Sequence, residues 1–404
     1  MSSKIQTIGA IEIGSSKIRV LIGEISHGRG PSLNIISKGE CQSRGVVKGD
    51  VVDLRAAGDA AHTAIHEAES GAGGLRIDRV FLAQTGGHLE GFYNEASVNV
   101  RSADYRVTQA DIDSVCELAT GRELPDGRAL VDDGIRQPFF LDGSIVSDAR
   151  NLRGRVLKVG YWMVHGDSAR LASNLDMVRG FNLKVDALIL SSLASGIMVT
   201  TPEERAGGVI AIDIGAGTTD YVLYRAGCAC MTGVVPVGGL HLTNDLCNGL
   251  RLGEGQAEKT KTRFGSGVVV TRDRGEKVWL DGDRGIGDRQ LSKNSIELIT
   301  SLRVAEIFEI VKKRLGPEFS PDQAVSGVVV TGGTSQLPGI ADAAAAVFGL
   351  PARAGEFPGR IHEQLRDPGW ATVLGLLHFG LDSTTAPAAP GPRAKGGWLR
   401  KLFS

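Results

Sequence analysis

Two pairs of short apolar runs, each broken by a turn of small and polar residues, stand out in the hydrophobic pattern of the chain. In the first pair, apolar positions over 8–13 precede the turn and those over 18–22 follow it. In the second pair, the runs cover 209–214 and 221–224. Apolar runs of this length, bounded by glycine and small polar residues, are typical of strand–turn–strand units. The pattern therefore predicts two β-hairpins.

The two hairpins repeat one motif. The first reads IGAIEIGSSKIRVLI over 8–22, and the second reads GVIAIDIGAGTTDYVLY over 208–224. Aligning Glu12 with Asp213 also aligns Gly14 with Gly215, at an offset of about half of the 404 residues. One such hairpin is ordinary in an α/β protein. Two copies at this spacing indicate two similar halves, each presenting a carboxylate and a glycine turn to a central site.

A third glycine motif, GVVVTGGTSQLPGI, covers 327–340. Its apolar start predicts a buried parallel strand over 328–330, and Gly332 and Gly333 predict a turn. The alanine-rich segment 340–348 that follows is predicted to be a helix. A strand, a glycine turn and a helix often face a nucleotide in α/β folds. Taken alone, the motif fits a tight strand-to-helix turn equally well.

Helical patterns occur in the two segments between the glycine motifs. Thr108 followed by Asp111 is a plausible N-cap pair, and apolar residues then recur on one face up to residue 119. This helix lies within 83–166, a segment that reads as a compact α/β unit, although a lid or a loop insertion is also possible. Residues 296–315 predict a long amphipathic helix.

The last residues of the chain have a different composition. Residues 383–395 are rich in Pro, Ala and Gly, which predicts a disordered, extended linker. In the terminal segment 396–404, four large apolar side chains share one helical face and two basic side chains lie outside it, as in helices that bind membrane surfaces. Nine helical residues cover only about 13 Å, too short to cross a bilayer. Docking of this helix on its own protein is the alternative. The membrane-binding candidates are Trp398, Leu399, Arg400, Lys401, Leu402 and Phe403.

Composition and charge narrow the class of protein. The chain is 42% hydrophobic with a mean hydropathy of −0.01, which is enough for a large core. The net charge of −1 gives no bulk attraction for nucleic acid. The five cysteines match neither a zinc motif nor a disulfide framework, so a reducing cytoplasm is the simplest setting. Glu12 interrupts the apolar stretch near the N-terminus, which excludes a signal peptide there.

The residues of the two hairpin turns suit a phosphate site. Glycine lets the backbone approach a ligand closely, and the N–H groups of a turn can point at phosphate oxygens. Ser15, Ser16, Thr218 and Thr219 add hydroxyl donors, and Lys17 adds a positive charge. Glu12 and Asp213 would repel bare phosphate. The two carboxylates are favourable in a phosphate site if Mg²⁺, which prefers oxygen ligands and keeps several waters, lies between them and the phosphate.

The three glycine motifs, in this order, resemble the actin-like ATPase superfamily, which includes actin, MreB, sugar kinases and DnaK-type chaperones. The resemblance implies a duplicated, ribonuclease H-like α/β fold with two halves around a cleft that binds ATP and Mg²⁺. Residues 187–197 resemble the helix that links the halves, and 234–246 resemble a strand-to-helix turn near the phosphates. Glu258 and Lys261, three apart on one helical face, would approach the ribose and base, unless that helix is merely a solvated charged one.

The same resemblance assigns roles to the site residues. Glu12 and Asp213 would orient Mg²⁺ through water. No residue declares itself as the base that activates water, so an ATPase activity is not predicted with certainty and slow or no hydrolysis of ATP is expected. The nucleotide-binding candidates are Gly14, Ser15, Ser16, Lys17, Asp213, Gly215, Ala216, Gly217, Thr218, Thr219, Gly238, Gly239, Glu258, Lys261, Gly332, Gly333 and Thr334.

Over nearly its whole length the chain resembles the FtsA family of bacterial cell-division proteins. The first motif reads Glu-Ile-Gly rather than the Asp-x-Gly of actin, and the stretches at 43–54, 106–115, 151–159 and 373–380 are similar to that family. The implied layout has a first large subdomain (1–82 and 167–200), an inserted subdomain (83–166), a second large subdomain (201–245 and 324–382) and a small lobe (246–323). The linker and the amphipathic helix complete it.

The resemblance to FtsA implies a scaffold more than an enzyme. Such a protein would tether FtsZ filaments to the cytoplasmic face of the cell membrane at the division septum, self-associate into filaments and recruit later division proteins. A PilM-type pilus assembly protein shares the fold and the inserted subdomain, but the basic amphipathic tail favours FtsA. A small-molecule kinase would need a substrate pocket and a base, and a DnaK-type chaperone would need a peptide-binding domain after residue 380.

Overall fold

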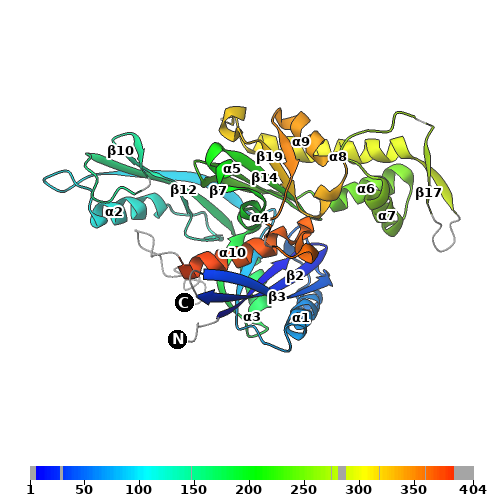
Figure 1. The fold of residues 1–404 in the computed structure, drawn as a ribbon, viewed down its shortest axis with the longest axis horizontal. Helices are drawn as coiled ribbons and strands as arrows, with labels where there is room; N and C mark the ends of the chain where they lie inside the picture. The colour runs from blue at the N-terminus through cyan, green and yellow to red at the C-terminus, as the bar shows by residue number, and fades with distance from the viewer. Residues whose placement is uncertain are drawn as a thin grey trace.

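Two five-stranded sheets of the same topology form the centre of the molecule (Figure 1). The computed structural model describes residues 6–27, 31–146, 148–273, 275–280, 288–317, 319–359 and 361–385. The strand order is β13-β6-β1-β2-β3 in the first sheet and β20-β19-β14-β15-β16 in the second. In each sheet three strands pair antiparallel and two more are added in parallel. The duplicated α/β fold is therefore confirmed.

Each hairpin supplies the central strand of its sheet. Both predicted hairpins are present, and the predicted strand at 328–330 lies parallel to β14. The first sheet consists of β1 (Gln6–Ile13), β2 (Lys17–His27), β3 (Pro31–Gln42), β6 (Arg79–Gln84) and β13 (Lys184–Leu190). The second consists of β14 (Val209–Ile214), β15 (Thr219–Arg225), β16 (Cys228–Val235), β19 (Val328–Thr331) and β20 (Ala352–Ala354).

Two apolar helices, α4 (Ser191–Val199) and α10 (Ala371–Thr385), lie between the two sheets (Figure 1). Both helices are almost completely buried over the part next to the sheets. This burial explains why apolar residues occur on every side of each helix and not on one face alone. The predicted helix over 187–197 needs a correction. Its first four residues belong to β13, because parallel pairing with β6 continues to Leu190, and the helix begins at Ser191.

Further helices cover the outer faces of the sheets. On the first half these are α1 (Leu54–Gly71) and α3 (Ser168–Arg179). A short hairpin, in which β4 (Val46–Val47) and β5 (Asp50–Val51) have two residues each, contacts α3. On the second half they are α5 (Pro202–Gly207), α8 (Lys293–Arg314) and α9 (Ile340–Phe348), where α9 matches its predicted range.

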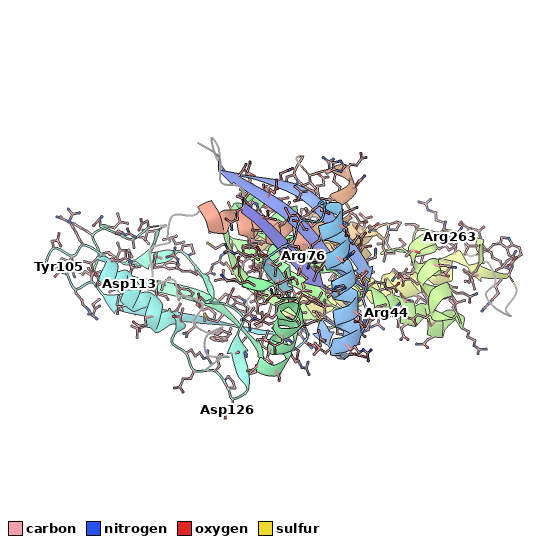
Figure 2. The ribbon with its side chains drawn as sticks, turned by 90° about the horizontal axis from the view of Figure 1, so that it is seen from below. Arg44, Arg76, Tyr105, Asp113, Asp126 and Arg263 are labelled. Atoms are coloured by element: carbon pink, nitrogen blue, oxygen red, sulfur yellow. The ribbon has the colours of Figure 1, made fainter. Side chains whose placement is uncertain are left out.

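The inserted subdomain and the small lobe form the two ends of the molecule. Figure 2 shows Tyr105 and Asp113 of the inserted subdomain at one end and Arg263 of the small lobe at the other. The inserted subdomain contains β7 (Glu90–Asn99), α2 (Gln109–Thr120), β8 (Arg128–Leu130), β9 (Ile135–Arg136), β10 (Phe139–Leu141), β11 (Ser144–Val146) and β12 (Val156–Asp167). The small lobe contains the end of α6 (Gly239–Leu250), which begins in the second large subdomain, together with α7 (Glu254–Phe264), β17 (Lys277–Leu280), β18 (Arg289–Ser292) and α8.

Two predictions about helices are borne out locally. Thr108 and Asp111 form a capping box at the start of α2, with the Thr108 side chain accepting from the Asp111 N–H and Asp111 accepting from the Thr108 N–H. The long helix predicted over 296–315 corresponds to α8 (Lys293–Arg314), although its amphipathic character is weaker than predicted, because Glu297 is buried while Leu298 and Leu302 are exposed.

The end of the chain is described only as far as α10. This helix runs to Thr385 and so includes the first three residues of the segment 383–395, which was predicted to be a linker. The rest of that segment and the predicted amphipathic helix over 396–404 lie outside the described residues. Among the helices in the described ranges, none combines the length and the apolar character needed to cross a bilayer.

Candidate functional site

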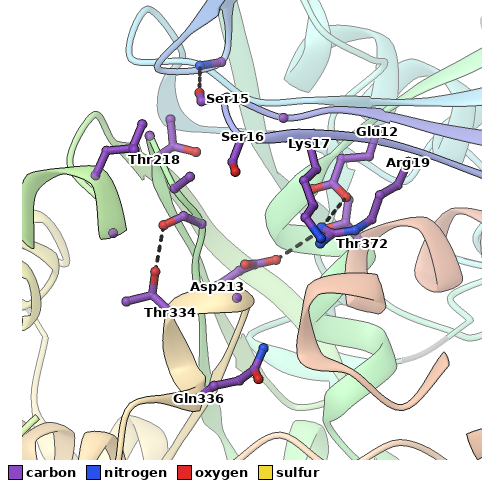
Figure 3. A pocket seen from close by; sticks show the side chains of 18 of the residues that line it. Glu12, Ser15, Ser16, Lys17, Arg19, Asp213, Thr218, Thr334, Gln336 and Thr372 are labelled. Carbon is purple, nitrogen blue, oxygen red and sulfur yellow. Dashed lines mark hydrogen bonds and ion pairs between the residues drawn. The ribbon is translucent and has the colours of Figure 1, made fainter. Parts of the chain in front are cut away.

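A polar cavity of about 830 Å³ lies between the two halves, where both hairpin turns meet (Figure 3). This volume is within the range of about 300–1,000 Å³ that is usual for small-molecule sites. Fifteen residues predicted for the nucleotide or for Mg²⁺ line it: Glu12, Gly14, Ser15, Ser16, Lys17, Asp213, Gly215, Ala216, Gly217, Thr218, Gly239, Glu258, Lys261, Gly333 and Thr334. The fold therefore brings all three glycine motifs to one cavity.

The two hairpin turns have the same backbone hydrogen bond. The Gly14 N–H donates to the Lys17 carbonyl oxygen at 3.1 Å, and the Gly215 N–H donates to the Thr218 carbonyl oxygen at 2.9 Å. The turns also approach each other closely, since a Cβ on Gly217 would collide with the Ser15 hydroxyl. The repeated sequence thus produces two matching turns that face one cavity from opposite sides.

The hairpins differ in the residue that stands opposite the acidic residue. In the first, β-sheet register pairs Glu12 with Arg19, whereas in the second it pairs Asp213 with Asp220. The Arg19 guanidinium lies 3.8 Å from the Glu12 carboxylate. The first hairpin therefore balances its acid with a cation, and the second places two carboxyls next to each other.

The carboxyl groups of the cavity resist ionisation. Burial raises the pKa of Glu12 from its ordinary value to about 7, against the opposing effect of Arg19 and with a further increase from the charge of Asp213. Burial, followed by the charge of Asp213, raises the pKa of Asp220 to about 8. Burial also raises the pKa of Asp213, although hydrogen bonds from Ser195 and Thr372 oppose it. A cation in the cavity would favour the ionised forms of all three.

The chemistry of these donors fits Mg²⁺ held mainly through water. The Glu12 Oε2 is buried and has no hydrogen-bond partner, so an acceptor is available on the cavity wall. Within the described part of the chain, no group of three or more acidic, histidine or cysteine side chains forms a ready metal cluster. Because Mg²⁺ usually keeps several waters and takes one or two carboxylates, this small ligand set is sufficient when phosphate oxygens supply the rest.

Lys17 and Arg19 share one acidic partner, Glu40 of β3. The Lys17 ammonium lies 2.5 Å from one Glu40 oxygen, and the Arg19 Nε donates to the other at 2.9 Å. Arg19 also donates to the Gly369 carbonyl oxygen at 2.7 Å and stacks over the Trp370 ring at 5.3 Å. Arg19, which the sequence did not single out, is therefore the cation fixed beside Glu12, while Lys17 is tied to Glu40.

At the other end of the cavity, Lys261 connects α6 and α7. Its ammonium donates to the Gly239 carbonyl oxygen at 3.1 Å, to the Thr243 hydroxyl at 2.9 Å and to the Glu258 carboxylate at 2.7 Å. The ammonium has three hydrogens, and each has a partner. Lys261 and Glu258 do share one helical face, as predicted, and Lys261 together with the Thr243 hydroxyl holds Glu258 on the cavity wall.

Three predicted site residues do not line the cavity but support its wall. The Thr219 hydroxyl donates to the Val237 carbonyl oxygen at 2.8 Å, and the residue is fully buried. Gly238 packs against the carbonyl groups of the second turn, where a Cβ would be too close. Gly332 has φ of +86°, and a Cβ there would collide with the Asp213 carboxylate.

Several cavity residues carry no recognisable signal in the sequence. They include Thr85, Ser191, Gln336, Asp367 and Thr372, which come from loops and helix ends that only the fold brings together. Asp220 could have been found, because it occupies in the second repeat the position of Arg19 in the first. A buried carboxyl that faces the cavity is a candidate general base once a cation favours its ionised form.

Solved structures with similar folds support the two-half architecture. The chain is similar to a structure titled "PilM-PilN type IV pilus biogenesis complex", with a TM-score of 0.60 and 18% identity, covering 93% of this chain and 98% of the other. It is also similar to MreB5 of Spiroplasma citri bound to ADP, with a TM-score of 0.55 and 15% identity, covering 95% and 99%. At these identities the similarity establishes the actin-like fold alone.

Sequence relatives are closer. A sequence model described as "Cell division protein FtsA" matches residues 210–375. The Neisseria meningitidis protein of that name is 32% identical, covering 94% of this chain and 91% of the relative. The Escherichia coli K12 protein of that name is 30% identical, covering 97% of both chains. With such identity across nearly its full length, this actin-like chain belongs to the FtsA family of bacterial cell division proteins.

Proposed function

We propose that this actin-like cell division protein binds ATP with Mg²⁺ and acts as a membrane-attached scaffold for FtsZ filaments. The observation that carries the ATP part is the pair of matching glycine turns, which face one cavity from the two halves with the same hydrogen bond. Backbone N–H groups of such turns can bind phosphate oxygens, and Ser15, Ser16 and Thr218 lie beside them with hydroxyl donors. The phosphates would therefore lie between the turns.

Mg²⁺ would supply the positive charge that the ionised carboxyls and the phosphates both need. Glu12 and Asp213 would hold it, in part through water. Arg19 would keep Glu12 in place and offset its charge. At the far end, the Glu258 carboxylate would accept from ribose hydroxyls, and Gly333 and Thr334 would lie beside the adenosine.

ATP in this cavity would control assembly more than it would feed a chemical transfer. Asp220 is a candidate base, but its pKa of about 8 means that ionisation requires a cation nearby. That requirement is compatible with slow hydrolysis coupled to assembly. Steady turnover of a small phosphate acceptor would instead favour a small-molecule kinase of the same superfamily.

FtsZ tethering, self-association into filaments and recruitment of later division proteins follow from membership of the FtsA family and remain proposals. The terminal segment 396–404 would attach the protein peripherally to the cytoplasmic face of the membrane at the septum. A PilM-type role is the alternative because the fold resembles a PilM complex. The FtsA relatives are nearly twice as similar in sequence, which favours the division role.

Reconstitution on supported bilayers of anionic lipid tests the proposal. Fluorescent FtsZ is added with the full-length chain or with a chain that lacks 396–404, each with and without MgATP. We expect FtsZ filaments on the bilayer only with the full-length chain and MgATP. Equal recruitment by the truncated chain would contradict the membrane role of the tail, and recruitment independent of nucleotide would contradict the role of ATP.

A further inference from the structure

The Thr85 hydroxyl reaches from the first half of the molecule to a buried carboxyl of the second half. Thr85 is the first residue after β6, and its Oγ1 lies 2.8 Å and 2.9 Å from the two carboxyl oxygens of Asp220. Both side chains line the cavity. The hydroxyl has one hydrogen to donate, so the two Asp220 oxygens share it. The Thr85 side chain therefore hydrogen-bonds across the two halves at the cavity wall.

The structure holds Thr85 in place from the side of the first half. The Gln84 amide donates to the Thr85 carbonyl oxygen at 2.9 Å, and its own oxygen accepts from Asn174 of α3 at 3.2 Å. Both of these side chains are buried. Because the hydrogen bond between Asn174 and Gln84 is buried, breaking it is costly. Thr85 is thus positioned without any ligand.

The residues after Thr85 lead directly into the inserted subdomain. Gly86 has φ of +142°, and a Cβ on Gly87 would press against Pro236 of the second half. His88 is buried, and its Nδ1 accepts from the Asp167 N–H at 3.0 Å, at the point where β12 leaves that subdomain. The segment that carries Thr85 is therefore anchored at the junction of both halves and the inserted subdomain.

We propose that Thr85 is a positioning residue of the nucleotide site, which holds the Asp220 carboxyl away from the phosphates and so sets the preference for ATP over ADP. The proposal rests on the proposed binding of ATP. Asp220 stands opposite Asp213 in the hairpin whose turn faces the phosphates. Without the Thr85 donor, the Asp220 carboxyl can turn toward the cavity. Because Mg²⁺ bound with the nucleotide favours the ionised form of Asp220, the carboxylate then opposes the terminal phosphate, which is the group that distinguishes ATP from ADP.

Three variants separate positioning from general structure. Thr85→Val has nearly the same shape but no donor, and Thr85→Ser keeps the donor. Thr63→Val is the matched control, since Thr63 is exposed and its hydroxyl donates to the Asp59 carbonyl oxygen one turn earlier in the same helix, α1. We measure the affinities of each full-length variant for MgATP and MgADP by calorimetry. The ATP-to-ADP affinity ratio should fall at least about tenfold in Thr85→Val, the effect of one hydrogen bond to a charged group, and stay within about twofold in the others.

Hydrogen exchange of the nucleotide-free protein provides a readout that does not need ATP. Thr85→Val should exchange faster than the unmodified chain over 79–84 and 209–225, and Thr85→Ser should not. If the unmodified chain binds neither nucleotide, the proposed ATP binding fails, and the role of Thr85 in selecting ATP fails with it. The exchange result still decides the separate question of whether Thr85 holds Asp220. If it binds ATP, an unchanged ratio in Thr85→Val, or the same loss in Thr85→Ser, overturns the positioning role.

Discussion

Single residues determine how the cavity is charged, because the two repeats differ at one cross-strand position. Arg19 offsets Glu12 in the first hairpin, whereas Asp220 stands next to Asp213 in the second. The sequence contains this difference at aligned positions. Its consequence depends on burial, which raises the pKa of each of these carboxyls and which no alignment of the two repeats reveals.

The stability of the nucleotide-free protein should fall as the pH rises from about 4 to about 8. In the unfolded chain Asp and Glu ionise near about pH 4. In the folded chain Glu12 and Asp220 keep their protons until about pH 7 and pH 8. The folded state therefore binds more protons between about pH 4 and pH 8, so stability is lost as the pH rises across that window. Urea unfolding from pH 5 to pH 9 measures it.

The variant Asp220→Asn isolates one contribution to this pH dependence. It cannot ionise, so the loss of unfolding free energy between pH 5 and pH 9 should shrink by an amount on the order of 4 kcal/mol, since one pKa unit is worth about 1.4 kcal/mol. Glu117→Gln, at an exposed position of α2, serves as the control and should leave the slope unchanged. An equal slope in Asp220→Asn and the unmodified chain would contradict the raised pKa.

Arg19 and Lys17 give a matched test of buried and exposed charge. Both pair with Glu40, but the Arg19 side chain is 15% exposed and the Lys17 side chain is 46% exposed. Removing the partner of a buried carboxylate costs about 3–5 kcal/mol, whereas an exposed pair contributes at most about 1 kcal/mol. The decrease in the free energy of unfolding at pH 8 should therefore be several times larger for Arg19→Met than for Lys17→Met. Similar losses would show that Arg19 does not compensate Glu12.

Secondary-structure elements are the scale at which the sequence was most informative. Period-2 apolar runs predicted both hairpins, and the capping pair Thr108 and Asp111 predicted the start of α2. The boundary between β13 and α4 could not be read, because residues 187–190 are as apolar as the helix that follows. The partners of Lys17 were also hidden, since Glu40 reaches it only through the pairing of β2 with β3.

The contact between α6 and α7 gives a prediction at this scale. Lys261→Met keeps the apolar stem but removes three hydrogen bonds, including one of the two that hold Glu258, the other being donated by the Thr243 hydroxyl. If Glu258 binds the ribose, the affinity for MgATP should fall about tenfold, because each hydrogen bond to a charged group is worth about 1.5–3 kcal/mol and part of the loss falls on folding. Lys259→Met, two residues away and exposed, is the control. Calorimetric titration measures the MgATP affinity of both variants. Equal affinities would show that Lys261 does not contribute to nucleotide binding.

The whole molecule has one feature that its repeated halves do not explain. The inserted subdomain belongs in sequence to the first half, yet it makes buried hydrogen bonds to β16 of the second. The Trp162 Nε1 donates to the Thr232 hydroxyl at 3.0 Å, and the Gln137 amide donates to the Ala229 carbonyl oxygen at 2.8 Å. The sequence suggested the insertion from its pattern but not this contact, which joins residues 70 and 92 positions apart.

These contacts should couple the inserted subdomain to the second half in a measurable way. Trp162→Phe keeps an aromatic ring but loses the donor, and Thr232→Val loses the acceptor at nearly constant volume. If the hydrogen bond holds the two parts together, a double-mutant cycle of unfolding free energies should give a coupling of about 1 kcal/mol, with the double variant less destabilised than the sum of the single ones. Pairing Trp162→Phe with the remote Thr63→Val should give no coupling. Additive losses in the first cycle would mean that packing alone, and not this hydrogen bond, holds the inserted subdomain against the second half. Movements of the two halves would then be only weakly coupled to the inserted subdomain.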